Sequence, residues 1–488
     1  MAVYYVATNG NSANAGTIDA PWADITDANG RVSPGDTVYI RGGTYNNSSR
    51  PALSVGTASG APVFFRRYRN EQVFITARDD YDASEFTATP EPNIWAKEIG
   101  RPDPLVNDNE CGVWYNNKTL AEQEALDKVN TNGFFYSSGV EFLYINVGDA
   151  VEPSGTVSVS FYSAIRFSGC GNVFFERLIF AYSFKGLGRM SLLGDSAHTG
   201  STTLEACVFY RIAQNGVQPM ERNWVFDQCL FYEHGSIDAL TFTNNYAYCV
   251  YTGSDSRPST FKGNIFFRSA LRGYQLHLYP SGPLSGGHVV EDNTSIGNDT
   301  GSAFVIADDN GGNTIRGNTV IGRRYSSLQQ AVFFGAVIRK TGNKIYNNRF
   351  VRLNGWIIQH STPGLVNDYR GNKVWNCPAY TYSQGSTSTY DVTKWQMTAP
   401  IASLFFTHNG STVNPGGTNA KVHRSAWSAQ APFMLFEDMQ DDEPTEQSAL
   451  NEHLAKYPDC GWFTLFPNHP AARVDIASYS PLLKTVNY

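Results

Sequence analysis

The sequence lacks several features that would each identify a common class of protein. It contains no run of about 18 consecutive apolar residues, so it predicts no membrane-spanning helix. Its 7 cysteines include no Cys-x-x-Cys pair, so it predicts no structural zinc site. Few segments have the 3.6-residue apolar period of amphipathic helices, which excludes a doubly wound α/β sheet. The leucine consensus of leucine-rich repeats is also absent.

An excess of positive charge is absent as well. The formal net charge is −7 at pH 7, which argues against a nucleic acid or an anionic membrane surface as the partner. The apolar stretch at residues 3–6 follows Met1 and Ala2 directly, without the charged start and cleavage site of a signal peptide. We therefore expect either a secreted, extracellular protein whose signal is not part of this sequence, or a virion component that needs none.

What the sequence does contain is a series of near-repeats between residues 172 and 377. Each repeat has a short apolar strand, a pivot residue and a second short apolar strand, as in Val-Phe-Asp-Gln-Cys-Leu-Phe and Thr-Phe-Lys-Gly-Asn-Ile-Phe. Successive pivots are 29, 22, 35, 29, 25, 30 and 24 residues apart, a period typical of a solenoid with loops of variable length. The pivots are Leu178, Cys207, Cys229, Asn264, Asn293, Asn318, Asn348 and Asn372.

These repeats predict an all-β fold, a parallel β-helix. Short strands stack on copies of themselves, one coil every ~4.8 Å, and bury a continuous apolar core. An asparagine at the same corner of each coil bonds the backbone of its neighbours and tolerates left-handed geometry, so it builds a ladder at the turn. Cys207 and Cys229 occupy this position on consecutive coils, where we expect two stacked, buried thiols; a disulfide is the alternative.

The domain organisation follows from where this pattern begins and ends. We expect a β-helix over residues 1–377, with an N-terminal cap at about 1–45 that includes a short helical stretch at 21–32. Residues 94–162 interrupt the coils as an inserted β flap with a short helix at 120–129, and the regular coils occupy 163–377. Residues 378–488 form a C-terminal tail or cap with an acidic helix at 441–457.

The first coils resemble a known family. They read Tyr-Tyr-Val-Ala-Thr-Asn-Gly-Asn from residue 4, Pro-Gly-Asp-Thr-Val-Tyr-Ile-Arg-Gly-Gly-Thr-Tyr from residue 34 and Pro-Val-Phe-Phe-Arg-Arg-Tyr from residue 62. This resembles the N-terminal coils of secreted right-handed β-helix proteins of the pectate-lyase-like superfamily. That group contains polysaccharide lyases, uronate epimerases and some glycoside hydrolases. The resemblance implies a right-handed parallel β-helix and a polysaccharide substrate, while the reaction varies within the group.

The resemblance also implies where the substrate lies, along a second series of strands that follow the pivots. In the strand at 273–279, period-2 alternation predicts that Leu276 and Leu278 point inward. Gln275, His277 and Tyr279 then point outward. In the preceding coil, Val250 is predicted to point inward, and Cys249 and Tyr251 outward. Adjacent coils then place Tyr251 beside His277 or Tyr279.

β-Elimination on a uronic acid needs a cation at the carboxylate, a base for the neighbouring proton and an acid for the leaving oxygen. We expect Arg272, or Arg268, to neutralise the carboxylate, and His277 and Tyr251 to form the base and acid pair. Lys185 is a further candidate base. The remaining predicted substrate-binding residues are Gln275, Tyr279, Arg268, His234 and Tyr248.

Asp308 and Asp309 open an oxygen-rich turn that fits calcium, although a plain turn explains the same residues. The alternative reaction is glycoside hydrolysis, which needs two carboxylates about 5 to 9 Å apart. Asp238, Glu291 and the two turn aspartates are its candidates. A third class is a non-catalytic glycan-binding or viral adhesion protein. Both a monomer and a homo-oligomer are compatible with the sequence.

Overall fold

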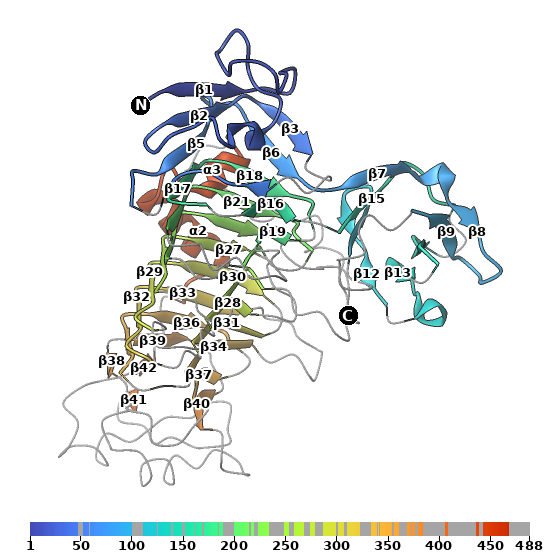
Figure 1. The fold of residues 1–488 in the computed structure, drawn as a ribbon. Helices are drawn as coiled ribbons and strands as arrows, with labels where there is room; N and C mark the ends of the chain where they lie inside the picture. Colours follow the sequence, from blue (N-terminus) through green and yellow to red (C-terminus); the bar gives the residue numbers. More distant parts are fainter. Residues whose placement is uncertain are drawn as a thin grey trace.

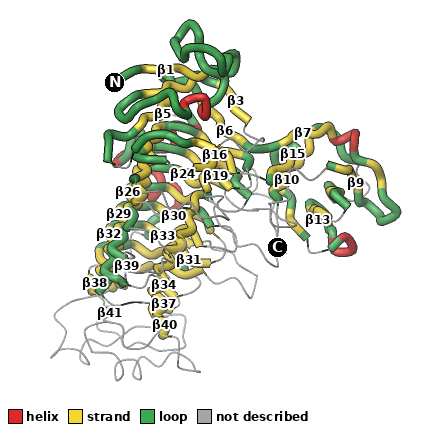
Figure 2. Tube along the Cα trace, viewed as in Figure 1, coloured by secondary structure: helices red, strands yellow, loops and turns green. Residues whose placement is uncertain are grey.

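A computed structural model gives the fold of the chain (Figure 1). It describes residues 1–488 apart from the following segments: 47–51, 58, 100–110, 124, 138–139, 149–151, 162, 168–169, 184, 189–199, 214–215, 219–222, 234–247, 253–257, 268–273, 279–285, 299–300, 307–309, 323–332, 339, 341, 354–355, 361–367, 371, 376–378, 384–405, 408–435, 439–442 and 468–488. The coils stack along one axis, so that their strands form three long parallel sheets that run along this axis. This arrangement confirms the predicted parallel β-helix (Figure 2).

Sheet A contains the first strand of each coil. In order along the axis its strands are β1 (Val3–Val6), β2 (Thr37–Ile40), β5 (Val63–Arg67), β17 (Val173–Glu176), β20 (Ser201–Glu205), β23 (Asn223–Asp227), β26 (Thr260–Lys262), β29 (Val289–Glu291), β32 (Thr314–Arg316), β35 (Lys344–Tyr346) and β38 (Asp368–Arg370).

Sheet B follows after the pivot. Its strands are β3 (Gly43–Asn46), β6 (Val73–Thr76), β18 (Ile179–Ala181), β21 (Val208–Tyr210), β24 (Leu230–Tyr232), β27 (Ile265–Phe267), β30 (Thr294–Asn298), β33 (Thr319–Gly322), β36 (Arg349–Val351), β39 (Asn372–Trp375), β42 (Phe436–Asp438) and β41 (Phe406–Thr407).

Sheet C is the second series predicted from the sequence. Its strands are β4 (Ala52–Leu53), β16 (Ser163–Phe167), β19 (Lys185–Gly188), β22 (Val217–Gln218), β25 (Val250–Thr252), β28 (Tyr274–Leu278), β31 (Gly301–Ile306), β34 (Phe333–Ile338), β37 (Trp356–His360) and β40 (Ala379–Ser383). The coils therefore continue past residue 377, the end expected from the repeats.

The inward residues of the three sheets fill one continuous core. Phenylalanines stack on one another from coil to coil, as Phe209 does on Phe231 with ring centroids 4.8 Å apart, and Phe226 on Phe261 at 4.8 Å. Parallel pairing without register shifts places identical positions one strand apart, so each aromatic ring finds another ring above it. Trp22 caps this core at the N-terminal end, next to the short helix η1 (Ile25–Ala28).

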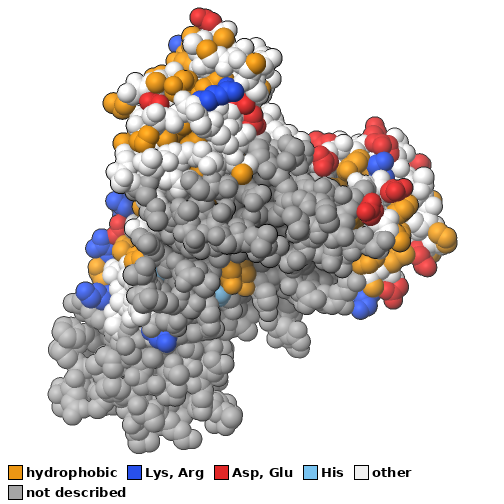
Figure 3. Space-filling view, viewed as in Figure 1, with side chains coloured by type: hydrophobic (Ala, Val, Ile, Leu, Met, Phe, Trp, Pro, Cys, Tyr) orange, Lys and Arg blue, Asp and Glu red, His pale blue; other side chains and the backbone are white. Residues whose placement is uncertain are grey.

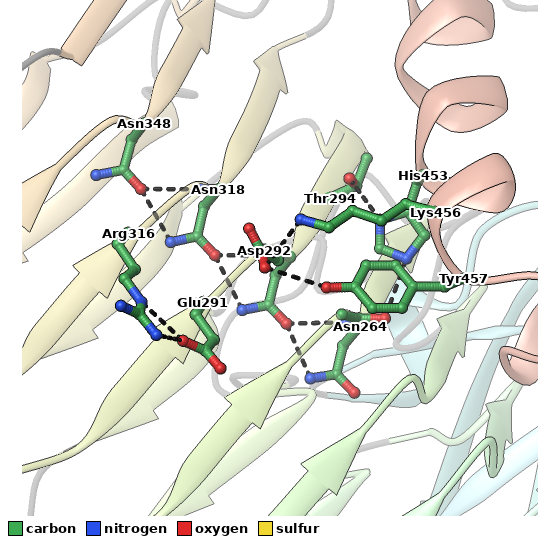
Figure 4. A network of polar contacts seen from close by, with 12 residues as sticks. Asn264, Glu291, Asp292, Thr294, Arg316, Asn318, Asn348, His453, Lys456 and Tyr457 are labelled. Atoms are coloured by element: carbon green, nitrogen blue, oxygen red, sulfur yellow. Dashed lines mark hydrogen bonds and ion pairs between the residues drawn. The ribbon is translucent and has the colours of Figure 1, made fainter.

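The predicted asparagine ladder lies between sheets A and B (Figure 4). The side-chain amide of Asn293 donates to Oδ1 of Asn318 at 2.9 Å, and its backbone N–H donates to the same oxygen at 2.9 Å. Asn318 repeats both bonds with Asn348, at 2.9 and 3.0 Å. All of these asparagines are buried, so the ladder satisfies polar groups that would otherwise be costly inside the core.

At the corners that the structure describes, the left-handed residue is the one before the pivot, and not the pivot as predicted. Asp292 has φ 56° before Asn293, and Asn347 has φ 55° before Asn348. The pivot must keep a geometry that lets both its amide and its backbone N–H reach the next coil. The sharp turn therefore falls on its neighbour, where Gly263, Gly317 and Asn347 adopt positive φ at low cost. At the first three corners the same conformation falls on Arg177, Ala206 and Gln228.

A second ladder, not anticipated from the sequence, lies at the corner before sheet A. The backbone N–H of His288 donates to Oδ1 of Asn313 at 2.8 Å, and the Asn313 amide donates to Oδ1 of Asn343 at 2.7 Å. Its signal was present in the chain, because each of these residues follows a glycine: Gly287, Gly312 and Gly342.

Cys207 and Cys229 are both fully buried and both free thiols, as predicted. Their Sγ atoms lie near backbone oxygens of sheet A, 3.5 Å from Phe175 O and 3.4 Å from Leu204 O. Burial raises the pKa of Cys207 to about 12 and that of Cys229 well above its ordinary value. The two thiols therefore replace the asparagine at this corner as small apolar groups.

The inserted flap begins at Asp79, earlier than the predicted residue 94. It consists of two small sheets, and its short helices are the 3-10 turns η2 (Ala83–Glu85) and η3 (Leu126–Lys128). Acidic side chains gather on its surface (Figure 3). Its strands are β11 (Lys118–Thr119), β10 (Gly112–Tyr115), β15 (Thr156–Ser160) and β7 (Asp79–Asp82) in one sheet, and β12 (Ala121–Glu122), β13 (Gly133–Ser137), β14 (Phe142–Asn146), β9 (Trp95–Glu98) and β8 (Thr87–Ala88) in the other.

The C-terminal segment 443–467 lies along the outside of sheet B. It contains α2 (Glu446–Lys456), which is shorter than the helix predicted at 441–457, and α3 (Gly461–Leu465). Leu450, Leu454 and Trp462 pack against outward-facing apolar residues of sheet B, such as Leu230 and Phe267. The outer face of this sheet is apolar because the segment covers it. Among the described residues, no helix has the length and hydropathy needed to cross a membrane.

Candidate functional site

The outer face of sheet C holds a cluster of three rings, Tyr248, Tyr251 and His277. Tyr251 on β25 pairs in register with His277 on β28. Their ring centroids are 5.0 Å apart and their planes differ by 6°. Tyr248 lies 5.0 Å from each of the other two rings. We call these residues the trio. The sequence-based prediction that Tyr251 lies beside His277 or Tyr279 is resolved in favour of His277.

The trio is held in place from below by the core. Val250, Leu276 and Leu278 are completely buried, and the alternation of the strands turns Tyr251 and His277 to the opposite side, where both are partly exposed. The predicted direction of these residues is therefore right.

The prediction for Cys249 is wrong, because its side chain is fully buried in the main core. Cys249 precedes the first residue of β25, so it lies in the turn, where the alternation of a strand does not yet apply.

The backbone before the trio is fixed by the preceding coil. Gly216 N–H donates to the carbonyl of Tyr248 at 2.9 Å, and Val217 N–H donates to the carbonyl of Cys249 at 2.9 Å. These bonds hold the turn that carries Tyr248, so its ring stays against the two rings of the neighbouring strands. A site on paired strands is positioned more rigidly than one on an isolated loop.

The flap contacts the solenoid next to this coil. Trp114 packs edge-on against Tyr182, with ring centroids 5.9 Å apart, and the Arg78 guanidinium lies 4.4 Å from the same tyrosine ring. A Cβ built at Gly112 would lie 2.5 Å from the Cβ of Ala213, so the flap and the solenoid are in direct contact there. Ala213 is on the turn that leads into β22, the strand before β25. The flap thus stands beside the coil that precedes the trio.

Two of the other predicted site residues lie on sheet C, with only the backbone described. Gln275 is on β28, two residues before His277. Lys185 is the first residue of β19 and pairs with Ser163, three residues before the row that leads through Gly188 and Gln218 toward the trio. Lys185 is therefore two coils before β25 and three residues before the row of Tyr251, the same offset as Tyr248, and its role as a candidate base stays a prediction.

Several predicted residues lie outside the described residues, and their predictions stay as they are. These residues are Arg268, Arg272, Tyr279, His234, Asp238, Asp308 and Asp309. Among the residues that the structure does describe, no group of three His, Cys, Asp or Glu side chains is placed to hold a metal ion.

Glu291, a candidate carboxylate for hydrolysis, is not in this site. It lies at the end of β29 in sheet A, on a different sheet from the trio, and forms an ion pair with Arg316. The Nε of Arg316 donates to Glu291 Oε2 at 2.7 Å. A carboxylate committed to this pair, across the coil from the trio, cannot act on a bond held there.

Comparisons with known proteins agree with this architecture. The family model "Pel9A-like, right handed beta helix region" matches residues 4–144, and the model "Right handed beta helix region" matches residues 163–350. A pectate lyase named PEL9 from Emericella nidulans is 37% identical over 86 residues, which are 18% of this chain and 20% of that protein. The uncharacterized protein YwoF from Bacillus subtilis is 40% identical over 72 residues, or 15% of each chain.

Solved structures with similar folds have low sequence identity. An alginate lyase from Paenibacillus sp. str. FPU-7 has a TM-score of 0.45 at 12% identity, with 79% of this chain and 98% of that chain covered. Pectate lyase Pel9A has a TM-score of 0.36 at 11% identity, with 80% of each chain covered. The chain thus spans a fifth or less of the length of the curated relatives it matches.

Proposed function

Since the chain belongs to the right-handed parallel β-helix proteins, we propose that it is a polysaccharide lyase that cleaves an acidic polysaccharide by β-elimination. The substrate lies along the outer face of sheet C, with the reacting uronic acid at the trio. The observation that carries this proposal is the register pairing of Tyr251 and His277, whose rings stack on adjacent coils.

The chemistry needs one group to remove a proton and another to supply one. A base takes the proton from the carbon next to the carboxylate. The electron pair left behind forms a carbon–carbon double bond, and the glycosidic C–O bond breaks. An acid then protonates the departing oxygen. An imidazole and a phenol are both able to exchange protons, and their side-by-side position lets them act on neighbouring atoms of one sugar. We assign the two roles to His277 and Tyr251 as a pair.

A cation at the substrate carboxylate makes the neighbouring proton more acidic. We propose Arg272 or Arg268 for this task, because an arginine binds a carboxylate through two parallel hydrogen bonds. Arg272 and Arg268 precede β28 in the chain. Calcium at Asp308 and Asp309 remains a proposal for the same task. Tyr248, whose ring lies 5.0 Å from each ring of the pair, offers a further aromatic contact to the sugar.

The family match supports a carbohydrate substrate. The Pel9A-like model covers the first coils and the flap, and a relative over part of this region is a pectate lyase by name. Polysaccharides of this kind are met outside the cell, so we propose an extracellular location for the protein.

The experiment is a panel of polymers with two readouts. Alginate, pectate, glucuronan and capsular polysaccharides are incubated with the full chain. Ultraviolet absorbance then reports unsaturated products, and a reducing-sugar assay reports every cleaved bond. A lyase gives both signals in equal amounts. New reducing ends without absorbance would sink the lyase proposal in favour of a glycoside hydrolase or depolymerase. Retained binding without any cleavage would favour the adhesion alternative.

A further inference from the structure

We propose that the outer face of sheet A, at its N-terminal coils, is a second binding surface for the same acidic polysaccharide. The substrate class rests on the proposed function, whereas the surface itself is seen in the structure. It consists of three tyrosines and three arginines, which we call the tyrosine–arginine patch: Tyr5, Tyr39, Tyr68, Arg41, Arg66 and Arg69.

The strands place the tyrosines on the outside. Val38 and Ile40 of β2 point into the core and are buried, so Tyr39 between them points outward. Tyr5 of β1 pairs in register with Tyr39. Tyr68 directly follows β5, on the next coil. All three side chains are partly exposed, although aromatic rings of this size are usually covered when they serve only stability.

The rings form a fixed array. Tyr5 and Tyr39 stack with centroids 5.8 Å apart, and Tyr68 meets both of them edge-on, at 5.7 and 5.9 Å. The three distances are nearly equal, so the rings form a compact triangular cluster and not a row along the coils. Such a cluster presents ring faces and edges together, which a sugar unit of the polymer can contact.

Arginines surround the array and give it a charge that suits an acidic chain. The guanidinium carbons of Arg41 and Arg69 lie 5.0 and 4.9 Å from the centre of the Tyr68 ring. Arg66 pairs in register with Tyr39 and lies 4.6 Å from the ring of Phe64. Arg69 is exposed. Arginines held over aromatic rings keep their outer N–H groups available for carboxylates.

The acidic residues within this region are fewer than the cations. Glu71 pairs with Arg41 at 3.0 Å and Glu176 with Arg66 at 2.9 Å. The Arg69 guanidinium lies over the Tyr68 ring and also interacts electrostatically with Glu71, so two carboxylates are shared among three arginines. The excess charge is therefore positive, in a protein whose net charge is −7. This complementarity favours an anionic polymer over a neutral glycan or a second copy of this chain.

The flap offers a natural comparison. Its outer face carries Phe135, Phe142 and Tyr144. The ring centroid of Tyr144 lies 6.1 Å from that of Phe135 and 6.2 Å from that of Phe142. These rings are partly exposed like those of the patch, but the flap, residues 79–160, contains far more Asp and Glu than Lys and Arg. An anionic polymer that recognises rings and arginines together should use the patch on sheet A and avoid the flap.

The patch and the trio lie on different sheets and at different heights of the solenoid, since β1, β2 and β5 precede β25 and β28 by several coils (Figure 1). A polymer held at both places keeps its reacting segment at a high local concentration near the trio. Short oligosaccharides cannot reach both, so they gain nothing from the patch.

The test measures binding to polygalacturonate and alginate by affinity electrophoresis, with hydroxyethylcellulose as the neutral control. The full chain is compared with a Tyr39→Ser/Arg69→Gln variant and with a Phe135→Ser/Tyr144→Ser variant of the flap. Arg69→Lys keeps the positive charge and tests whether binding needs the paired N–H groups of the guanidinium. Thermal unfolding of each variant shows that the fold is intact.

We expect the sheet A variant to bind one of the acidic polymers about tenfold more weakly, while its turnover of a short oligosaccharide and the binding of the flap variant stay unchanged. Equal binding by the wild type and the sheet A variant would overturn the proposed role of the patch. A loss of polymer binding in the flap variant as large as that in the sheet A variant would overturn it too. A change in oligomeric mass without a change in polymer binding would assign the face to a second copy instead. Binding through the patch without any cleavage would leave this inference standing and overturn the proposed lyase.

Discussion

Thr294 and His453, separated by 159 residues in the chain, share a buried hydrogen bond of 2.8 Å between Oγ1 and Nδ1. The other ring nitrogen, Nε2, lies 3.0 Å from the carbonyl oxygen of Gly263 and donates to it. Nδ1 therefore accepts from the threonine hydroxyl, and the imidazole is neutral. This pair joins the C-terminal segment 443–467 to two coils of sheet B (Figure 4).

The attachment of this segment should weaken in acid. Burial, helped by the nearby Lys456, lowers the pKa of His453 from 6.5 to about 4. An unfolded or detached segment binds a proton near pH 6.5, so the contribution is complete above that pH and is lost as the pH falls toward 4. The loss is about 1.4 kcal/mol per pH unit in this range. Hydrogen exchange of residues 446–456 between pH 7.5 and 4.5 measures it, and His453→Gln should flatten the profile. A wild-type profile as flat as that of the variant would contradict the assignment.

Gly461 is a second point where the segment touches the solenoid. Its N–H donates to Gln228 O at 2.7 Å, and a Cβ placed there would lie 2.7 Å from Cys207 O and from Leu230 N. We expect Gly461→Ala to push α3 away and to speed proteolysis of the C-terminal segment at least tenfold, since about 1.4 kcal/mol of lost contact gives that factor. Ala455→Ser, at an exposed position of α2, serves as the control. Equal rates of proteolysis in both variants would show that the backbone shifts to make room for the added methyl group and that the contact is kept.

The asparagine ladder should carry much of the stability of the middle coils. Replacing Asn318 by Ala removes its side-chain bonds to Asn348 and to Val290 O and leaves the N–H of Asn293 without its acceptor. We expect a loss of about 3 kcal/mol or more in the free energy of unfolding, because buried donors remain unpaired. Urea unfolding followed by far-ultraviolet circular dichroism measures this. Asn223→Ala, at an exposed position, should change the midpoint little; an equal shift would mean that the ladder is dispensable.

The thiols of Cys207 and Cys229 should be unreactive in the folded protein. Burial raises the pKa of both, and the thiolate is the reactive form. Iodoacetamide at pH 8 should therefore label neither residue until denaturant is added, as followed by mass spectrometry of the peptides. Both should be labelled fully after unfolding without a reductant. A requirement for reductant would reveal a disulfide.

If the proposed lyase is right, Tyr251→Phe and His277→Ala should each lower kcat by a factor of about 10² to 10⁴, the usual contribution of general acid–base catalysis. KM should change less, because the phenylalanine keeps the ring that stacks on the sugar. Tyr144→Phe, on the flap, is the matched control for loss of a hydroxyl. Rates near that of the wild type in both trio variants would place the reaction elsewhere on the solenoid.

The residues of the trio could be predicted from the sequence. The bounds of the flap and of the C-terminal helix could be predicted only in part. The alternation of Leu276 and Leu278 determined which way His277 points, because a strand has a fixed period of two. The pairing of His277 with Tyr251 needed the register between coils. The loop between them varies in length, so counting along the chain does not give it. The burial of Cys249 shows the same limit, since alternation fails where a strand has not yet begun.

By itself, the sequence determined that short strands stack into a parallel β-helix with asparagines at one corner, because that pattern repeats locally in every coil. It also determined the buried state of the cysteines that replace the asparagine. Only the tertiary structure decided that Tyr251 pairs with His277 and not with Tyr279, and that Glu291 belongs to an ion pair on another sheet. It also decided that the C-terminal helices cover sheet B. These outcomes depend on contacts between residues far apart in the chain, which no local period encodes.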